Sequence, residues 1–167
     1  SLADVDVIGF PEGVLKALVK LKEEKTARVI GFTGHLTAEG MAEAARRYDF
    51  DTMLIALNHY QERKGDMEGG AIPAAAEKKM GIMIIKAVRP RETVKDIPAE
   101  KLIRYSLSLP LVHSAVIGTD SVEVVEKNAA LLETFKPLSA EEMKALMVSI
   151  EPFMAGTGLP WMRPGYR

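Results

Sequence analysis

The sequence predicts an α/β fold built on a parallel β-sheet. Four short apolar runs, at 28–32, 51–57, 81–85 and 111–117, alternate with amphipathic helical segments. Apolar runs without polar alternation are typical of parallel strands that are buried on both faces and joined by right-handed crossovers. The β-α unit of about 30 residues is the one periodicity in the chain. Four such units match half of a (β/α)₈ barrel or a small open, doubly wound sheet, and no early Gly-x-Gly-x-x-Gly turn supports the second.

The composition is that of an ordinary soluble globular domain. The 167 residues carry a formal charge of −1 and are 47% hydrophobic, enough for one domain with one core, so we expect a single unit over 1–167 or a part of a longer barrel. No basic excess or aromatic–basic interleaving indicates nucleic acid, and no apolar run approaches the ~20 residues of a membrane span. The absence of cysteine excludes disulfides and thiolate metal sites and fits a cytoplasmic protein.

The first half of the chain predicts two helices and two strands. Pro11 favours a helix start, and the spacing of apolar residues predicts a helix over 12–25. A strand follows at 28–32. Thr37 is a good N-cap for a helix over 38–47, and a strand over 51–57 comes next.

The second half continues the alternation and ends in a helix and a tail. We expect a helix over 72–80, a strand over 81–85, a helix that Pro98 opens, and a strand over 111–117. The next helix, 121–134, has an apolar stripe that we expect to face the core: Val122, Val125, Ala129 and Leu132. Ser139 and Glu142 have capping-box spacing and start a helix to about residue 151, before a Gly/Pro-rich tail that holds Trp161.

Polar residues follow each predicted strand at its carboxyl end, where ligands bind in both candidate architectures. They are Thr33, Gly34 and His35; Asn58; Lys86, Arg89 and Arg91; and Gly118, Thr119, Asp120 and Ser121. The set is partly cationic and rich in small hydrogen-bond donors, and the last turn opens a helix, whose N-terminus favours anions. We therefore predict an anionic, hydroxyl-rich ligand such as a nucleotide or a sugar phosphate.

Each of these residues also has a purely structural interpretation. The turn at 118–121 is equally an ordinary capped strand–helix turn, Lys86 either acts in the mouth or extends its ammonium to solvent, and Arg89 and Arg91 either clamp a phosphate or are solvated. His113, inside a strand, is expected to be structural. No catalytic set stands out, since there is no Ser-His-Asp elbow, close carboxylate pair or cysteine. A Schiff-base role for Lys86 remains a minor alternative.

Three segments, in order, resemble the aldo/keto reductase family. Its fifth-strand motif, R-x-I-G-V-S-N/T-H, is similar to the run Arg28-Val29-Ile30-Gly31-Phe32-Thr33-Gly34-His35. Its eighth-strand segment, V-I-P-G-x followed by E-N, resembles the run at 115–119 together with Glu126, Lys127 and Asn128. Its L-S-x-E-E helix start resembles the run at 138–142.

The resemblance implies the C-terminal half of a (β/α)₈ barrel, strands five to eight, from an NAD(P)H-dependent reductase of aldehydes or ketones. It implies that this chain lacks the catalytic Asp-Tyr-Lys-His set and mainly holds NADPH or NADH, with a missing N-terminal half-barrel or a second copy as partner. The implied cofactor-binding residues are Thr33, Gly34, Asn58, Lys86, Arg89, Gly118, Thr119, Asp120, Lys127 and Asn128. Several positions depart from the family: among them, Gly34 has no side-chain amide, and Val124 replaces an arginine that often holds the 2′-phosphate. The others are Leu54, Ala87 and Lys127. The alternative is a non-catalytic nucleotide or sugar-phosphate binding module.

Overall fold

The computed structural model describes residues 2–35, 37–57 and 67–154. Four parallel strands form one sheet in the order β1 (Gly31–Gly34), β2 (Thr52–Ala56), β3 (Gly81–Ile85) and β4 (Ser114–Val116). The predicted α/β fold with a parallel sheet is confirmed. Asn58 and the tail with Trp161 lie outside the described residues.

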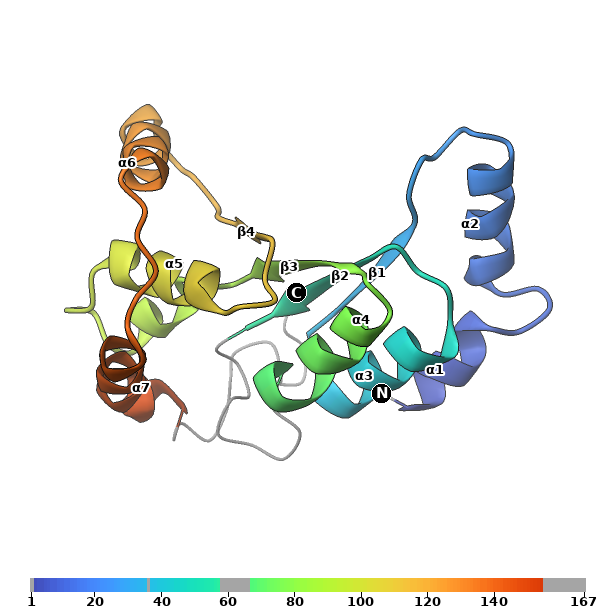
Figure 1. Cartoon of the computed structure of the whole chain (residues 1–167), viewed down its shortest axis with the longest axis horizontal. Helices are drawn as coiled ribbons and strands as arrows, with labels where there is room; N and C mark the ends of the chain where they lie inside the picture. Colours follow the sequence, from blue (N-terminus) through green and yellow to red (C-terminus); the bar gives the residue numbers. More distant parts are fainter. Residues whose placement is uncertain (1, 36, 58–66, 155–167) are drawn as a thin grey trace.

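The strand order decides between the two architectures that the sequence left open. Each crossover moves one strand further in the same direction, through α3 (Ala38–Arg47), α4 (Ile72–Glu77) or α5 (Ala99–Ser108). Because such crossovers are right-handed, a constant direction places all the connecting helices on one face, whereas a doubly wound sheet needs a reversal of direction. Figure 1 shows α3 and α4 together on one side of the sheet. The arrangement is that of half a barrel.

Among the described residues, burial alternates along the central strands, so one face of the sheet is covered more completely than the other. Met53, Ile55, Ile82 and Ile84 are fully buried between the sheet and the helices. Their neighbours on the opposite face, among them Leu54 and the Met83 and Ile85 side chains of β3, are only half-buried. An all-parallel sheet ordinarily has both faces covered, as it has when a barrel closes around its inner residues.

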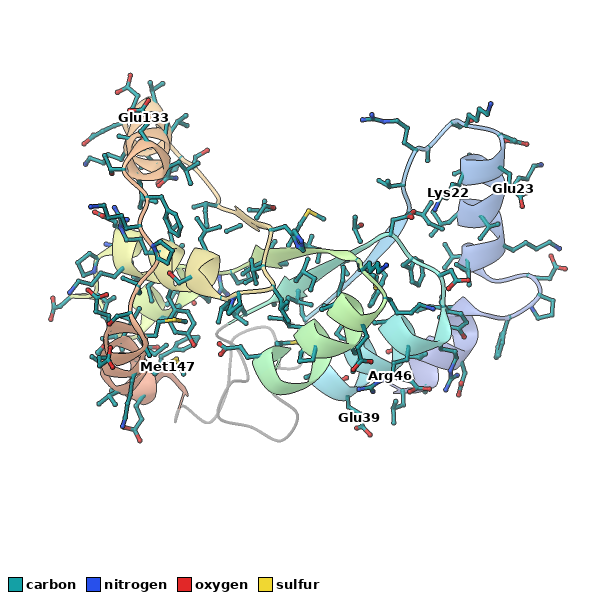
Figure 2. All side chains as sticks on the ribbon, in the orientation of Figure 1. Lys22, Glu23, Glu39, Arg46, Glu133 and Met147 are labelled. Atoms are coloured by element: carbon teal, nitrogen blue, oxygen red, sulfur yellow. The ribbon has the colours of Figure 1, made fainter. Side chains whose placement is uncertain are left out.

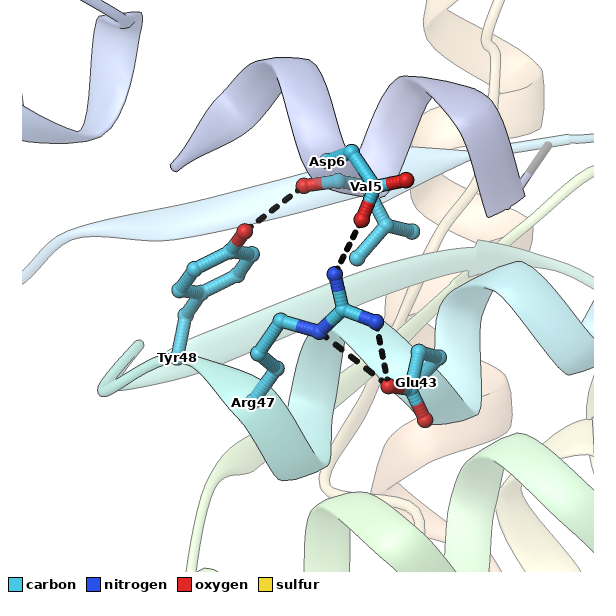
Figure 3. A network of polar contacts seen from close by, with 5 residues as sticks. All are labelled: Val5, Asp6, Glu43, Arg47 and Tyr48. Atoms are coloured by element: carbon cyan, nitrogen blue, oxygen red, sulfur yellow. Dashed lines mark hydrogen bonds and ion pairs between the residues drawn. The ribbon is translucent and has the colours of Figure 1, made fainter. Parts of the chain in front are cut away.

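A short helix at the start of the chain, α1 (Leu2–Ile8), was not predicted. Polar contacts attach it to α3, as Figure 3 shows: Arg47 pairs with Asp6, and the Tyr48 hydroxyl donates to the Val5 carbonyl oxygen over 2.7 Å. Arg47 also bonds to Glu43, with its Nη2 atom 2.7 Å from the carboxylate. The partners of Val5 and Asp6 lie more than 40 residues away in the sequence, so local periodicity gave no signal for the helix.

The remaining helices follow the predicted order with shifted ends. They are α2 (Val14–Glu23), a π-helical turn η1 (Met67–Ala71) before α4, a 3₁₀ turn η2 (Arg89–Glu92), α6 (Val122–Glu133) and α7 (Ala140–Met154). The strand predicted from residue 28 begins only at Gly31, because the Ile30 N–H donates to the Asp51 carboxylate over 2.8 Å instead of to a neighbouring strand. The strand predicted over 111–117 is reduced to 114–116. His113 has the structural role expected, since its Nδ1 atom accepts the Ile82 N–H over 3.0 Å.

The prediction for the inner face of α6 was wrong. Val122, Val125 and Leu132 are 75%, 50% and 60% exposed, whereas Leu131 is buried. The helix follows a three-residue edge strand and, within the described part of the chain, faces α5 across a cleft. Its apolar stripe is therefore left without a covering surface among the described residues. Among all the described residues, no helix combines the length and the apolar character needed to cross a lipid bilayer.

Candidate functional site

Two adjoining clefts lie at the carboxyl ends of β3 and β4. The larger, of about 1030 Å³, separates α5 from α6, and the smaller, of about 570 Å³, lies over the end of β3. The residues common to both walls are Val88, Arg91, Ile117 and Gly118. The two clefts therefore adjoin along these four residues and together make a groove, a shape that suits an extended ligand.

The turn between β4 and α6 forms the middle of this groove. Gly118, Thr119 and Asp120 are exposed and line the larger cleft. The Ser121 side chain caps α6 by accepting the Val124 N–H over 3.3 Å. A Cβ atom added to Gly118 would meet no other atom within 4 Å, so the fold itself does not require glycine there. The open space leaves the backbone accessible to a ligand, as phosphate-binding turns require.

Lys86 forms the floor of the smaller cleft together with the residues that follow it. Its backbone has a φ of 64°, in the left-handed region that is uncommon for a lysine, and its carbonyl oxygen accepts the Arg89 N–H over 3.0 Å. His35 lines the same cleft from the end of β1. Burial, and then the charge of Lys86, lower the pKa of His35, so this imidazole is neutral at pH 7. Of the two, only Lys86 offers a positive charge to an anion.

The two arginines of the β3 loop have different surroundings. The Arg89 Nη1 atom lies 2.6 Å from Glu92 Oε1, and its side chain is only 20% exposed. Arg91 is exposed and lines both clefts. Arg91 is therefore better placed than Arg89 to reach a ligand that spans the groove, although the sequence gave no reason to prefer it.

The outer wall of the larger cleft belongs to α6. Val124, Lys127 and Asn128 line it. Lys127 Nζ lies 2.6 Å from Glu123 Oε1, and this contact lowers the pKa of the glutamate. Asp120 lies on the adjoining turn. Among the described residues, each cation at this end of the groove therefore has an acidic neighbour.

Thr33 and Gly34 lie outside the two clefts. They line a separate hollow of about 170 Å³ between α1 and α3, and His35 lines both this hollow and the smaller cleft. A side chain at Gly34 would collide with the Met41 sulfur atom. Met41 is 6% exposed and belongs to the core, so the missing side-chain amide at Gly34 follows from packing.

The structure thus brings together seven of the ten predicted cofactor-binding residues. They are Lys86, Arg89, Gly118, Thr119, Asp120, Lys127 and Asn128. The sequence missed the wall opposite α6, which the start of α5 provides through Pro98, Ala99, Glu100 and Ile103. The proline that opens α5 was visible, but nothing local placed it across from α6. Within the described ranges no cluster of acidic or imidazole side chains is suited to a metal ion.

No model of a known protein family matches the sequence, and no curated protein matches it. Solved structures do: the holo form of aldo-keto reductase AKR11C1 from Bacillus halodurans is 19% identical, with a TM-score of 0.62 over 93% of this chain and 59% of that chain. The apo form is also 19% identical, with a TM-score of 0.61 over 95% and 62%. The chain spans about 60% of the length of these proteins. At this identity the likeness shows the fold, which is that of part of an aldo-keto reductase barrel, the family that the strand-end motifs resemble.

Proposed function

We propose that this chain forms the part of an aldo/keto reductase that holds the nicotinamide dinucleotide, NADPH or NADH. The reaction would be reduction of an aldehyde or a ketone. The cofactor would supply a hydride, and this chain's own residues would bind and orient the cofactor along the groove between Lys86 and Asn128.

The single observation that supports this proposal most strongly is that the two clefts adjoin at a shared wall. A dinucleotide has two halves joined by a pyrophosphate, and the walls common to both clefts combine the exposed backbone of Gly118 with the guanidinium of Arg91. Backbone N–H groups and a guanidinium are the donors that bind phosphate most effectively. The pyrophosphate would lie at this junction, with the adenosine between α5 and α6 and the nicotinamide toward Lys86.

The proton donor of the reaction would come from another half-barrel. Among the described residues that line the two clefts there is no tyrosine, and His35 is neutral. By itself this chain is therefore expected to bind the cofactor without consuming it. The alternative, a nucleotide-binding module with no reaction of its own, predicts the same binding but no turnover in any assembly.

A pair of glycine variants tests the proposal. ADP-ribose, which carries the adenosine and pyrophosphate, is titrated calorimetrically into the wild type, Gly118→Ala and Gly70→Ala. Cβ atoms at both glycines meet nothing within 4 Å, but only Gly118 lines the groove. We expect Gly118→Ala to weaken binding about tenfold or more, which corresponds to about 1.4 kcal/mol or more of binding free energy. Gly70→Ala is expected to leave binding unchanged. Equal binding by all three proteins would refute the proposed site.

The charges at the adenosine end predict cofactor preference. The 2′-phosphate of NADPH would be a dianion close to Asp120 and Glu123, with Val124 where the family often has an arginine. NADH is therefore expected to bind at least as tightly as NADPH. The dissociation constants of the two cofactors check this, and a clear preference for NADPH would contradict it.

A further inference from the structure

The wall that α5 gives to the larger cleft is apolar except at one residue. That residue is Glu100, the second residue of the helix, and its neighbours in the wall are Pro98, Ala99 and Ile103. Leu131 continues the apolar lining on α6, and both Ile103 and Leu131 are buried. Figure 1 shows α5 and α6 at the same end of the molecule. Because a few polar groups in an apolar site fix the orientation of a ligand, Glu100 is the group on this wall that can do so.

Arg104, one turn further along α5, holds the Glu100 carboxylate. Arg104 Nε donates to Glu100 Oε1 over 2.9 Å, and the two side chains are 17% and 60% exposed. The segment between α6 and α7 fixes the arginine in turn. The guanidinium carbon lies 5.9 Å from the centre of the Phe135 ring, and Nη1 donates to the Lys136 carbonyl oxygen over 3.5 Å. A carboxylate accepts about four hydrogen bonds, so this contact orients Glu100 and leaves it able to accept more.

We infer that Glu100 accepts a hydrogen bond from the 2′-hydroxyl of the adenosine ribose and thereby selects a dinucleotide without a 2′-phosphate. The inference rests on the proposed function, in which the adenosine lies between α5 and α6. A carboxylate has acceptors but no donors, so it binds a hydroxyl, whereas a phosphate brings like charge and no donor. One side chain therefore both binds the correct ribose and rejects the phosphorylated one.

The cations that line the larger cleft have other partners in this arrangement. Among the described residues these cations are Arg91 and Lys127. Arg91 belongs to the wall shared with the smaller cleft, where we propose the pyrophosphate, and Lys127 Nζ lies 2.6 Å from Glu123 Oε1. Asp120 adds a second carboxylate to the lining. A 2′-phosphate near Glu100 would therefore meet unfavourable charge.

Calorimetric titration of three ligands into the wild type tests the inference. They are ADP-ribose, its analogue without the adenosine 2′-hydroxyl, and its analogue with a phosphate on that hydroxyl. We expect each change to weaken binding about tenfold or more, as is typical of a lost hydrogen bond to a charged group. If ADP-ribose itself does not bind, the proposed function fails. If ADP-ribose binds and either analogue binds equally well, the inference about Glu100 alone is overturned.

Glu100→Gln and a matched control, Glu39→Gln, assign the selectivity to one side chain. Each glutamate is exposed and is the second residue of a ten-residue helix, but α3, where Figure 2 labels Glu39, lines neither cleft. Both changes remove one negative charge. We expect Glu100→Gln to reduce the penalty for the 2′-phosphate about tenfold or more, and Glu39→Gln to leave it unchanged. Equal penalties in the two variants would contradict the role of Glu100.

Arg104→Gln tests whether the arginine positions Glu100. The charge of Glu100 remains in this variant, so the penalty for the 2′-phosphate is expected to persist. The penalty for removing the 2′-hydroxyl is expected to fall, because the carboxylate is no longer held, and Arg104→Lys is expected to restore part of it. A loss of affinity that is equal for all three ligands would show that Arg104 supports only the fold.

Discussion

Replacement of Arg91 by alanine should reduce binding of a dinucleotide without changing the stability of the chain. Arg91 is exposed and lines both clefts, so its guanidinium is expected to bond to the bridging phosphates. A hydrogen bond to a charged group contributes about 1.5–3 kcal/mol, so the dissociation constant of ADP-ribose should rise about 10- to 150-fold. Exposed substitutions of this kind change the free energy of unfolding by about 0.5 kcal/mol or less.

The control is Arg46→Ala. Arg46 is also an exposed arginine, but it lies on α3, where Figure 2 labels it, and α3 lines neither cleft. Isothermal titration calorimetry measures binding, and urea denaturation followed by circular dichroism measures stability. If both arginine variants lose the same amount of affinity, the effect is one of net charge, and the reasoning about the shared wall is refuted.

Two further predictions concern the packing that supports the site. Asp51→Asn should lower the free energy of unfolding by about 1 kcal/mol, because the carboxylate holds Lys22 Nζ at 2.6 Å and the Ile30 N–H at 2.8 Å. These bonds lower the pKa of Asp51. Its contribution to the free energy of unfolding is therefore present above its unfolded pKa of about 3.9 and is lost as pH falls through the folded pKa. Urea titrations from pH 7 to pH 3 should show a smaller loss of unfolding free energy in the variant than in the wild type. Gly34→Asn should destabilise the chain by about 1–3 kcal/mol through collision with Met41. Met41→Ala in the same chain should remove part of that cost. If thermal denaturation shows that Gly34→Asn is fully tolerated, the packing described is contradicted.

The sequence was sufficient for the order of the strands and their parallel direction, because the central strands are continuous apolar runs that alternate with helical segments. β3 has the bounds that the pattern predicted. The α6 stripe failed for the opposite reason: periodicity identifies which residues share a face but not what covers that face. Val122 and Leu132 form a regular stripe that lies at an edge of the sheet.

Prediction of the site was similarly uneven. Lys86 and Gly118 were accessible to sequence reasoning because each directly follows a predicted strand, and parallel strands end at one edge. The difference between Arg89 and Arg91 depends on a 3₁₀ turn that pairs Arg89 with Glu92, and no residue pattern indicated this turn. The wall at the start of α5 depends on tertiary packing alone.

Hydrogen exchange of the full chain with and without ADP-ribose, read by mass spectrometry, tests the central claim most directly. The claim is that one ligand spans the groove formed by the β3 loop and the β4–α6 turn. Slower exchange is expected in both segments together, around Val88–Arg91 and around Ile117–Ser121, with no change in α3. Protection confined to one segment, or located in the hollow between α1 and α3, would contradict the account.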